Sequence, residues 1–196
     1  MKRVMIAAVV AAVMAVAGTA QALEFSADMV STAAGQQVSG KIYVANDKVR
    51  MEMPGATTIT RIDAKVVWVI MPEQEMYMEQ PFDPEKIAGA TEKMPGEIER
   101  TPLGTEAVDG KEAQMYRITY TSKAAEATVL QWVDKASGIP VKTEAEDGSW
   151  SMEYRNLVIG APDASLFEIP SGYKKFALPN MANMMQALQE NRAGEE

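Results

Sequence analysis

Residues 41–53 read Lys-Ile-Tyr-Val-Ala-Asn-Asp-Lys-Val-Arg-Met-Glu-Met, with an aliphatic or methionine side chain at every second position on either side of Asn46-Asp47. Successive side chains of a strand point to opposite faces, so this alternation predicts two strands that each bury one face. Asn and Asp tolerate the positive φ angles of tight turns, so the pair predicts the loop of an antiparallel hairpin.

The same rhythm recurs through most of the chain and predicts a mainly β fold of the α+β class. Short connections between consecutive strands favour an antiparallel meander, and so many strands favour a strongly curved sheet over a flat one. The expected strands cover residues 25–32, 37–45, 48–53, 57–63, 66–71, 76–80, 113–121, 128–134, 139–144 and 150–158.

Two segments break the strand rhythm. Residues 83–100 predict a short helix and loop, because Asp83 suits an N-cap, Pro84 suits the first helical position, and Pro95-Gly96 ends the segment. After Pro179-Asn180, apolar residues recur at helical spacing and predict an amphipathic helix that serves as a lid. Its apolar stripe consists of Met181, Met184, Met185 and Leu188.

The N-terminus predicts export. Lys2 and Arg3 precede a charge-free apolar run over residues 4–17, and Ala20-Gln21-Ala22 is a small-residue cleavage site. This pattern is typical of a removable signal peptide, whereas an uncleaved anchor would need about 20 apolar residues. We therefore expect a signal peptide at 1–22, one domain at 23–178, and a helix with a frayed tail at 179–196. The mature protein is expected to be periplasmic, without a transmembrane segment.

The composition excludes several classes of site. The chain has neither Cys nor His, which removes thiol chemistry, the commonest general base and the commonest zinc ligand. Loss of Lys2 and Arg3 with the signal peptide moves the formal charge from −8 to −10, which disfavours nucleic acid as a partner. No nucleophile or phosphate-loop motif is present, so we expect no enzyme, no catalytic residue and no cofactor.

Because alternate residues of a strand share a face, the sequence predicts a ligand-binding groove on one face of the curved sheet, rich in methionine and tryptophan. Methionine suits surfaces that adapt to varied apolar partners, but it also fills gaps in ordinary cores, so a packed core is the alternative. A site for a soft metal such as Cu(I) is a second alternative, because two Met-x-Met pairs place thioethers on one strand face. The predicted groove residues are Val49, Met51, Met53, Trp68, Ile70, Met76, Met78, Leu130, Trp132, Trp150, Met152 and Tyr154.

Several segments together resemble the periplasmic lipoprotein carriers of the Lol system (LolA-like). Residues 40–52 are similar to their second and third strands, residues 62–72 to their D-G-K-x-x-W-x-x-x-P hairpin, and residues 163–173 to their closing F-x-x-P-x-G element. Two departures are Ala64 in place of the hairpin glycine, and Asn46-Asp47 in place of the R-P turn whose Arg is tied to closing the cavity.

The resemblance implies an incomplete β-barrel closed by helices, with an apolar cavity for acyl chains. We therefore expect a non-enzymatic carrier or receptor that binds a lipid or an acylated lipoprotein and serves outer membrane biogenesis. The departure at Asn46-Asp47 weakens the case for lipoprotein transfer itself. The alternative is an envelope module that docks a protein partner or senses stress.

Overall fold

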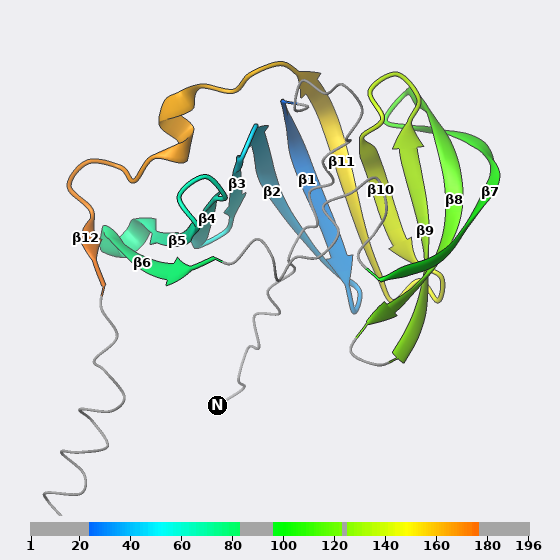
Figure 1. The fold of residues 1–196 in the computed structure, drawn as a ribbon, viewed down its shortest axis with the longest axis horizontal. Coiled ribbons are helices and arrows are strands. Elements are labelled where there is room, and N and C mark those ends of the chain that lie inside the picture. Colours follow the sequence, from blue (N-terminus) through cyan, green and yellow to red (C-terminus); the bar gives the residue numbers. More distant parts are fainter. Residues whose placement is uncertain (1–23, 83–95, 123–124, 177–196) are drawn as a thin grey trace, which may run out of the picture.

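The computed structural model describes residues 24–82, 96–122 and 125–176. These residues form one sheet of 12 strands, in the order β12-β6-β5-β4-β3-β2-β1-β11-β10-β9-β8-β7 (Figure 1). The sheet is antiparallel except where β12 runs parallel to β6. It is open, because β12 and β7 form its two edges. The described residues contain no α-helix and two short 3-10 turns, so the mainly β class is confirmed.

The strand bounds, in chain order, are β1 Phe25–Ala33, β2 Gln36–Ala45, β3 Lys48–Met53, β4 Ala56–Arg61, β5 Val66–Met71, β6 Met76–Pro81, β7 Glu97–Val108, β8 Lys111–Ser122, β9 Ala125–Asp134, β10 Pro140–Ala145, β11 Trp150–Ile159 and β12 Lys174–Lys175. The 3-10 turns are η1 Pro72–Gln74 and η3 Ala164–Phe167. The first strand is central: β1 pairs with β2 on one side and with β11 on the other, and so joins a β1–β6 meander to a β7–β11 meander.

All ten expected strands are present, and two more were not expected. The predicted loop over residues 96–100 is wrong from Glu97 onward, where β7 begins. This strand lies at the sheet edge, is exposed along most of its length and is interrupted by bulges around Pro102 and Gly104, so it lacks a buried periodic face. The predicted signal peptide, the helix expected at 83–95 and the lid helix lie outside the described residues.

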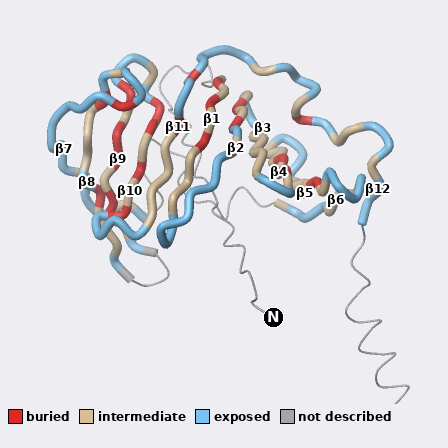
Figure 2. Tube along the Cα trace, turned by 180° about the vertical axis from the view of Figure 1, so that it is seen from behind, coloured by how far each residue is buried: buried red, intermediate tan, exposed pale blue. Residues whose placement is uncertain are grey.

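Two apolar clusters stabilise the sheet. The larger contains Phe25, Met29, Ile42 and Tyr154 and extends from β1 and β2 through β11 to Trp132 on β9. The smaller consists of Ile59, Ile70 and Phe167. Figure 2 shows buried positions along β1, β2, β9 and β10, whereas β6, β7 and β12 are exposed or half-buried along nearly all of their length. Among the described residues, no helix is both long and apolar enough to cross a bilayer.

Candidate ligand-binding face

Ladders of mostly apolar side chains, each with a threonine on β4, run across β2 to β6 on one face of the sheet. Ile42 pairs with Met51, Met51 with Thr58, Thr58 with Val69, and Val69 with Met78. Directly opposed residues of neighbouring strands point to the same side, so these five side chains share one face. A second ladder beside the first runs from Val44 through Val49 and Thr60 to Val67, and Met71 pairs with Met76. We call the resulting surface the methionine face; its members are Val49, Met51, Met53, Val67, Val69, Met71, Met76 and Met78.

The methionine face divides into two parts by packing. Val49, Met51 and Met53 on β3 pack against the larger core cluster. The members on β5 and β6 belong to neither cluster of the described residues, although each is half-buried. These five are Val67, Val69, Met71, Met76 and Met78. The outer half of this face is therefore apolar but is not part of the core.

The opposite face of the same strands is closed by the chain itself. Residues 160–176, here the closing segment, run from the end of β11 to β12 beside β6 (Figure 1). Phe167 is 0% exposed and clusters with Ile59 and Ile70. The other side chains that pack against this cluster are Tyr43, Ala45, Trp68, Tyr77, Leu166, Ile169 and Tyr173. This side of the sheet is thus a filled core.

Two arginines hold the closing segment against the sheet through hydrogen bonds. Arg50 Nη1 donates to the main-chain oxygen of Leu166 at 2.8 Å, and Arg61 Nη1 donates to Glu168 Oε1 at 3.0 Å. The Arg61 guanidinium also donates to Asp63, which raises the pKa of Arg61 and lowers the pKa of the Asp63 carboxyl. Both arginines are thereby fixed on the side of the sheet that carries Phe167.

Eight of the twelve predicted groove residues lie on one side of the sheet. Five belong to the methionine face. Trp150, Met152 and Tyr154 lie on the same side across β1, because Tyr154 pairs with Met29, which pairs with Gly40. Tyr154 is buried in the larger core cluster, and burial raises the pKa of its phenol to about 12.

The prediction of a shared face is wrong for Trp68 and Ile70. They alternate with Val67 and Val69 and therefore point into the core beneath the closing segment. Trp68 Nε1 donates to Glu79 Oε2 at 3.1 Å, and the Arg61 guanidinium carbon lies 5.6 Å from the centre of the Trp68 ring. Every residue of β5 is apolar, so alternation along this strand gives no indication of which set faces which side.

Leu130 and Trp132 also point away from the methionine side. Trp132 pairs with Lys142, whereas Met152 pairs with the next residue, Thr143. Lys142 Nζ lies 4.3 Å from the centre of the Trp132 ring, and Trp132 Nε1 donates to Glu106 Oε2 at 2.8 Å. Trp132 is 5% exposed and belongs to the core.

Val67, Val69 and Met71 also belong to the methionine face but were not predicted from the sequence. The Pro72 turn could have indicated their side, because the residues that flank it, Met71 and Met76, pair directly.

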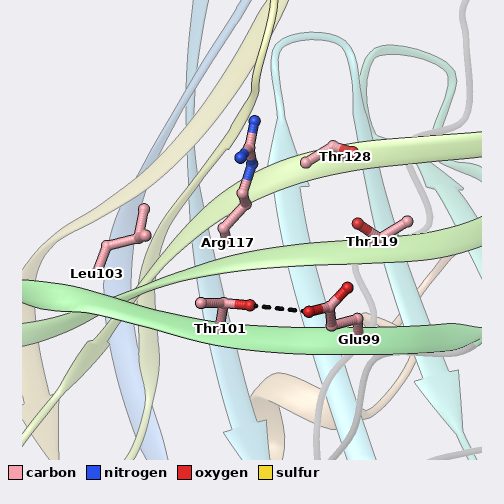
Figure 3. A pocket seen from close by; sticks show the side chains of 6 residues that line it. All are labelled: Glu99, Thr101, Leu103, Arg117, Thr119 and Thr128. Carbon is pink, nitrogen blue, oxygen red and sulfur yellow. Dashed lines mark hydrogen bonds between the residues drawn. The ribbon is translucent and has the colours of Figure 1, made fainter.

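A separate hollow of about 210 Å³ lies on strands β7 to β9 (Figure 3). Thr101 Oγ1 donates to Glu99 Oε1 at 3.3 Å inside it, and Arg117 pairs with Glu146. A lining of this kind does not suit an acyl chain. The lining residues are Glu99, Thr101, Leu103, Arg117, Thr119 and Thr128. Within the described ranges, no group of three or more Asp and Glu side chains is placed to hold a metal ion.

Comparison with solved structures shows distant similarity of fold. A crystal structure of MucB matches with a TM-score of 0.51 and 14% identity over 76% of this chain and 58% of MucB. The lipoprotein LppX from Mycobacterium tuberculosis matches with a TM-score of 0.43 and 12% identity, over 69% of this chain and 84% of LppX. A putative outer membrane lipoprotein-sorting protein domain from Vibrio parahaemolyticus matches with a TM-score of 0.34 and 13% identity, over 73% of this chain and 88% of that domain.

At these identities the similarity concerns the fold alone, and the chain spans just over half of the MucB structure. The chain thus has distant structural similarity to MucB, and the finer resemblance to lipoprotein carriers stays a prediction. No curated protein matches the chain. A family model described as a domain of unknown function, DUF4412, matches residues 24–136. The chain therefore belongs to the DUF4412 family.

Proposed function

We propose that this protein is a non-enzymatic carrier or receptor of the periplasm that binds the acyl chain of a lipid or lipoprotein on its methionine face. The observation that carries the proposal is the set of five half-buried apolar side chains on β5 and β6 that join neither core cluster of the described residues. Apolar side chains outside the core are typical of surfaces that bind an apolar partner.

The chemistry of the face suits a flexible hydrocarbon. Methionine side chains are unbranched and polarizable, so they adapt to chains of different shape. Burying an acyl chain gains about 0.8 kcal/mol for each CH₂ group removed from water. The ladder from Met51 to Met78 crosses β3 to β6, which at about 4.8 Å per strand is roughly 14 Å. An extended hydrocarbon chain of roughly ten to twelve carbons has about this length.

The opposite face of the sheet is a poorer candidate for binding an acyl chain. Phe167 and its neighbours fill it, and the Arg50 and Arg61 hydrogen bonds hold that filling in place. A ligand on the methionine face would therefore lie against a sheet whose other side is already packed. The N-terminal sequence is typical of an export signal, which supports a binding event outside the cytoplasm.

The experiment is equilibrium binding of a fluorescent fatty-acid probe to protein stripped of lipid. Val69→Thr and Met78→Gln keep side-chain size and make the face polar, and together they should weaken binding by about tenfold or more. Val66→Thr is the matched control, because it makes the same exchange on the same strand but points to the opposite side. Equal affinity of the double variant and the control, with both folded, would overturn the proposal.

A further inference from the structure

We propose that the ligand of the methionine face is an anionic amphiphile, whose carboxylate or phosphate group binds the Lys174 ammonium at the outer rim of the sheet. This inference rests on the proposed function, because it names the class of lipid that the same face would take. It is carried by the positions of the charged side chains on β1–β6 and β12.

The charged residues of β1–β6 all point to one side of the sheet. Side chains alternate along a strand, and directly paired residues of neighbouring strands point to the same side, so the register assigns every residue to a side. The charged residues share the side of Ile59, Ile70 and the closing segment. They are Asp28, Lys41, Lys48, Arg50, Glu52, Arg61 and Glu79.

On the methionine side, the strands β1–β6 present no charged residue. The polar residues there are uncharged, and they are Ser31, Gln36, Thr58, Thr60 and Gln80. A charged group loses favourable hydration when an apolar ligand covers it, so a side without charges suits a long hydrocarbon chain. In a chain of formal charge −8, this separation leaves a neutral, mostly apolar surface.

Lys174 brings a positive charge to the edge of this neutral surface. On β12, Lys174 pairs with Met76 in parallel register and therefore points to the methionine side. The next residue, Lys175, pairs with Tyr77 and points to the opposite side, where its Nζ lies 2.6 Å from Glu79 Oε1. Lys174 is exposed and forms no ion pair with any residue that the structure describes. One lysine of β12 is thus neutralised, and the other is available to an anion.

The surroundings of Lys174 suit the anionic end of an acyl chain. Met76 lies beside it on β6, and Phe176, two residues further on, points to the same side and is 37% exposed. An ammonium attracts an anion more strongly beside apolar side chains than in open water, because the local dielectric constant is lower. The strands from β12 to β3 cover roughly 19 Å at about 4.8 Å per spacing. An extended chain of about ten to fifteen carbons, held at Lys174, would therefore lie across the methionine face.

A second cation on the same side of the sheet is already paired. Arg100 on β7 donates from Nη1 to Gln131 Oε1 at 3.2 Å, and Gln131 is connected to Met152 through its pairing with Thr143. The Arg100 Nη2 atom also lies 2.8 Å from Glu97 Oε2. A lipid anion would have to displace that carboxylate, whereas the exposed lysine of β12 requires no such exchange.

Calorimetric titration of the mature protein, stripped of lipid, with decanoate, decyl phosphate and 1-decanol tests the inference. The three ligands share one chain length and differ in the head group. Lys174→Gln should weaken binding of decanoate and decyl phosphate by about threefold or more and leave 1-decanol binding unchanged. Lys175→Gln is the matched control, because it removes the same charge from the next residue, which points to the other side.

The two anionic ligands distinguish the sources of the charge. Tighter binding of decanoate indicates a free fatty acid and tighter binding of decyl phosphate a phospholipid, and either supports the inference if Lys174→Gln removes the preference over 1-decanol. Equal affinity for all three ligands, or an equal effect of Lys174→Gln and Lys175→Gln, would overturn the inference and leave the proposed function standing. Failure of all three ligands to bind would overturn both.

Discussion

Arg50 on β3 and Leu166 in the closing segment, 116 residues apart in the chain, are joined by a hydrogen bond of 2.8 Å from Nη1 to the main-chain oxygen. Glu52 accepts from Nε of the same guanidinium at 2.7 Å and so fixes its orientation. A hydrogen bond from a charged donor is one of the stronger hydrogen bonds in a protein, and this one is partly buried. This contact helps to hold the closing segment against one face of the sheet, on the side opposite to the methionine face.

Replacing Arg50 by Met tests the contribution of this hydrogen bond to stability. The substitution keeps an unbranched apolar stem but removes the donor to the Leu166 oxygen, so the free energy of unfolding should fall by about 1–3 kcal/mol. Urea unfolding followed by tryptophan fluorescence measures it. Lys41→Met on neighbouring β2 is the control, because Lys41 is exposed and pairs across from Glu52. An equal loss of unfolding free energy in both variants would show that the Arg50 hydrogen bond does not stabilise the fold.

Phe167→Ala should be far more damaging. The side chain is fully buried between Ile59 and Ile70, and truncating a buried phenylalanine costs about 3–5 kcal/mol. Phe176→Ala removes the same atoms from an exposed position in the same part of the chain and should cost less than about 1 kcal/mol. Thermal unfolding of the two variants gives the comparison, and a small loss at Phe167 would contradict the packing described above.

Gly40→Ala should also destabilise the sheet. A methyl group at Gly40 would lie 2.3 Å from the Glu52 main-chain oxygen and 2.7 Å from Met53 Sδ, so β2 and β3 would have to move apart. Overpacking of this kind costs about 1–3 kcal/mol. Ser39→Ala on the same strand is exposed and serves as the control. Equal unfolding midpoints for the two variants would contradict the close approach of the strands.

Alkaline pH should weaken the fold through Tyr154. Burial raises the pKa of this phenol from 10 to about 12, so between these values the folded protein keeps a proton that the unfolded chain has lost. The free energy of unfolding must then fall as the pH rises from 10 to 12, by on the order of 2–3 kcal/mol. Tyr154→Phe cannot ionise and should lack this part of the loss. Parallel pH dependences for the two proteins would show that Tyr154 is not buried as described.

The sequence predicted the strands that have one apolar face and failed where that condition does not hold. Lys48 to Met53 alternates strictly, and its three apolar residues lie on one side as expected. On β5 both sides of the strand are apolar, because one packs on Phe167 and the other forms the methionine face, so Trp68 and Ile70 were assigned to the wrong side. Side assignment there needs the register from the neighbouring turn.

The two unexpected strands are edge strands. On β7, Pro102 and Gly104 accompany a bulge, and most side chains are exposed, so no apolar period marks the strand. On β12, two lysines pair with β6 over only two residues. Their strand character comes from a partner that lies about a hundred residues earlier in the chain, which local propensity does not reveal.

The methionine face is proposed to bind an acyl chain. Native mass spectrometry of the mature protein, purified without detergent and followed by solvent extraction, tests it most directly. Binding on this face predicts a mass shift that is removed by extraction and that matches a lipid or acylated peptide in the extract. It also predicts loss of the shift in the Val69→Thr, Met78→Gln double variant but not in Val66→Thr. A protein of unmodified mass that takes up no added lipid would contradict the claim.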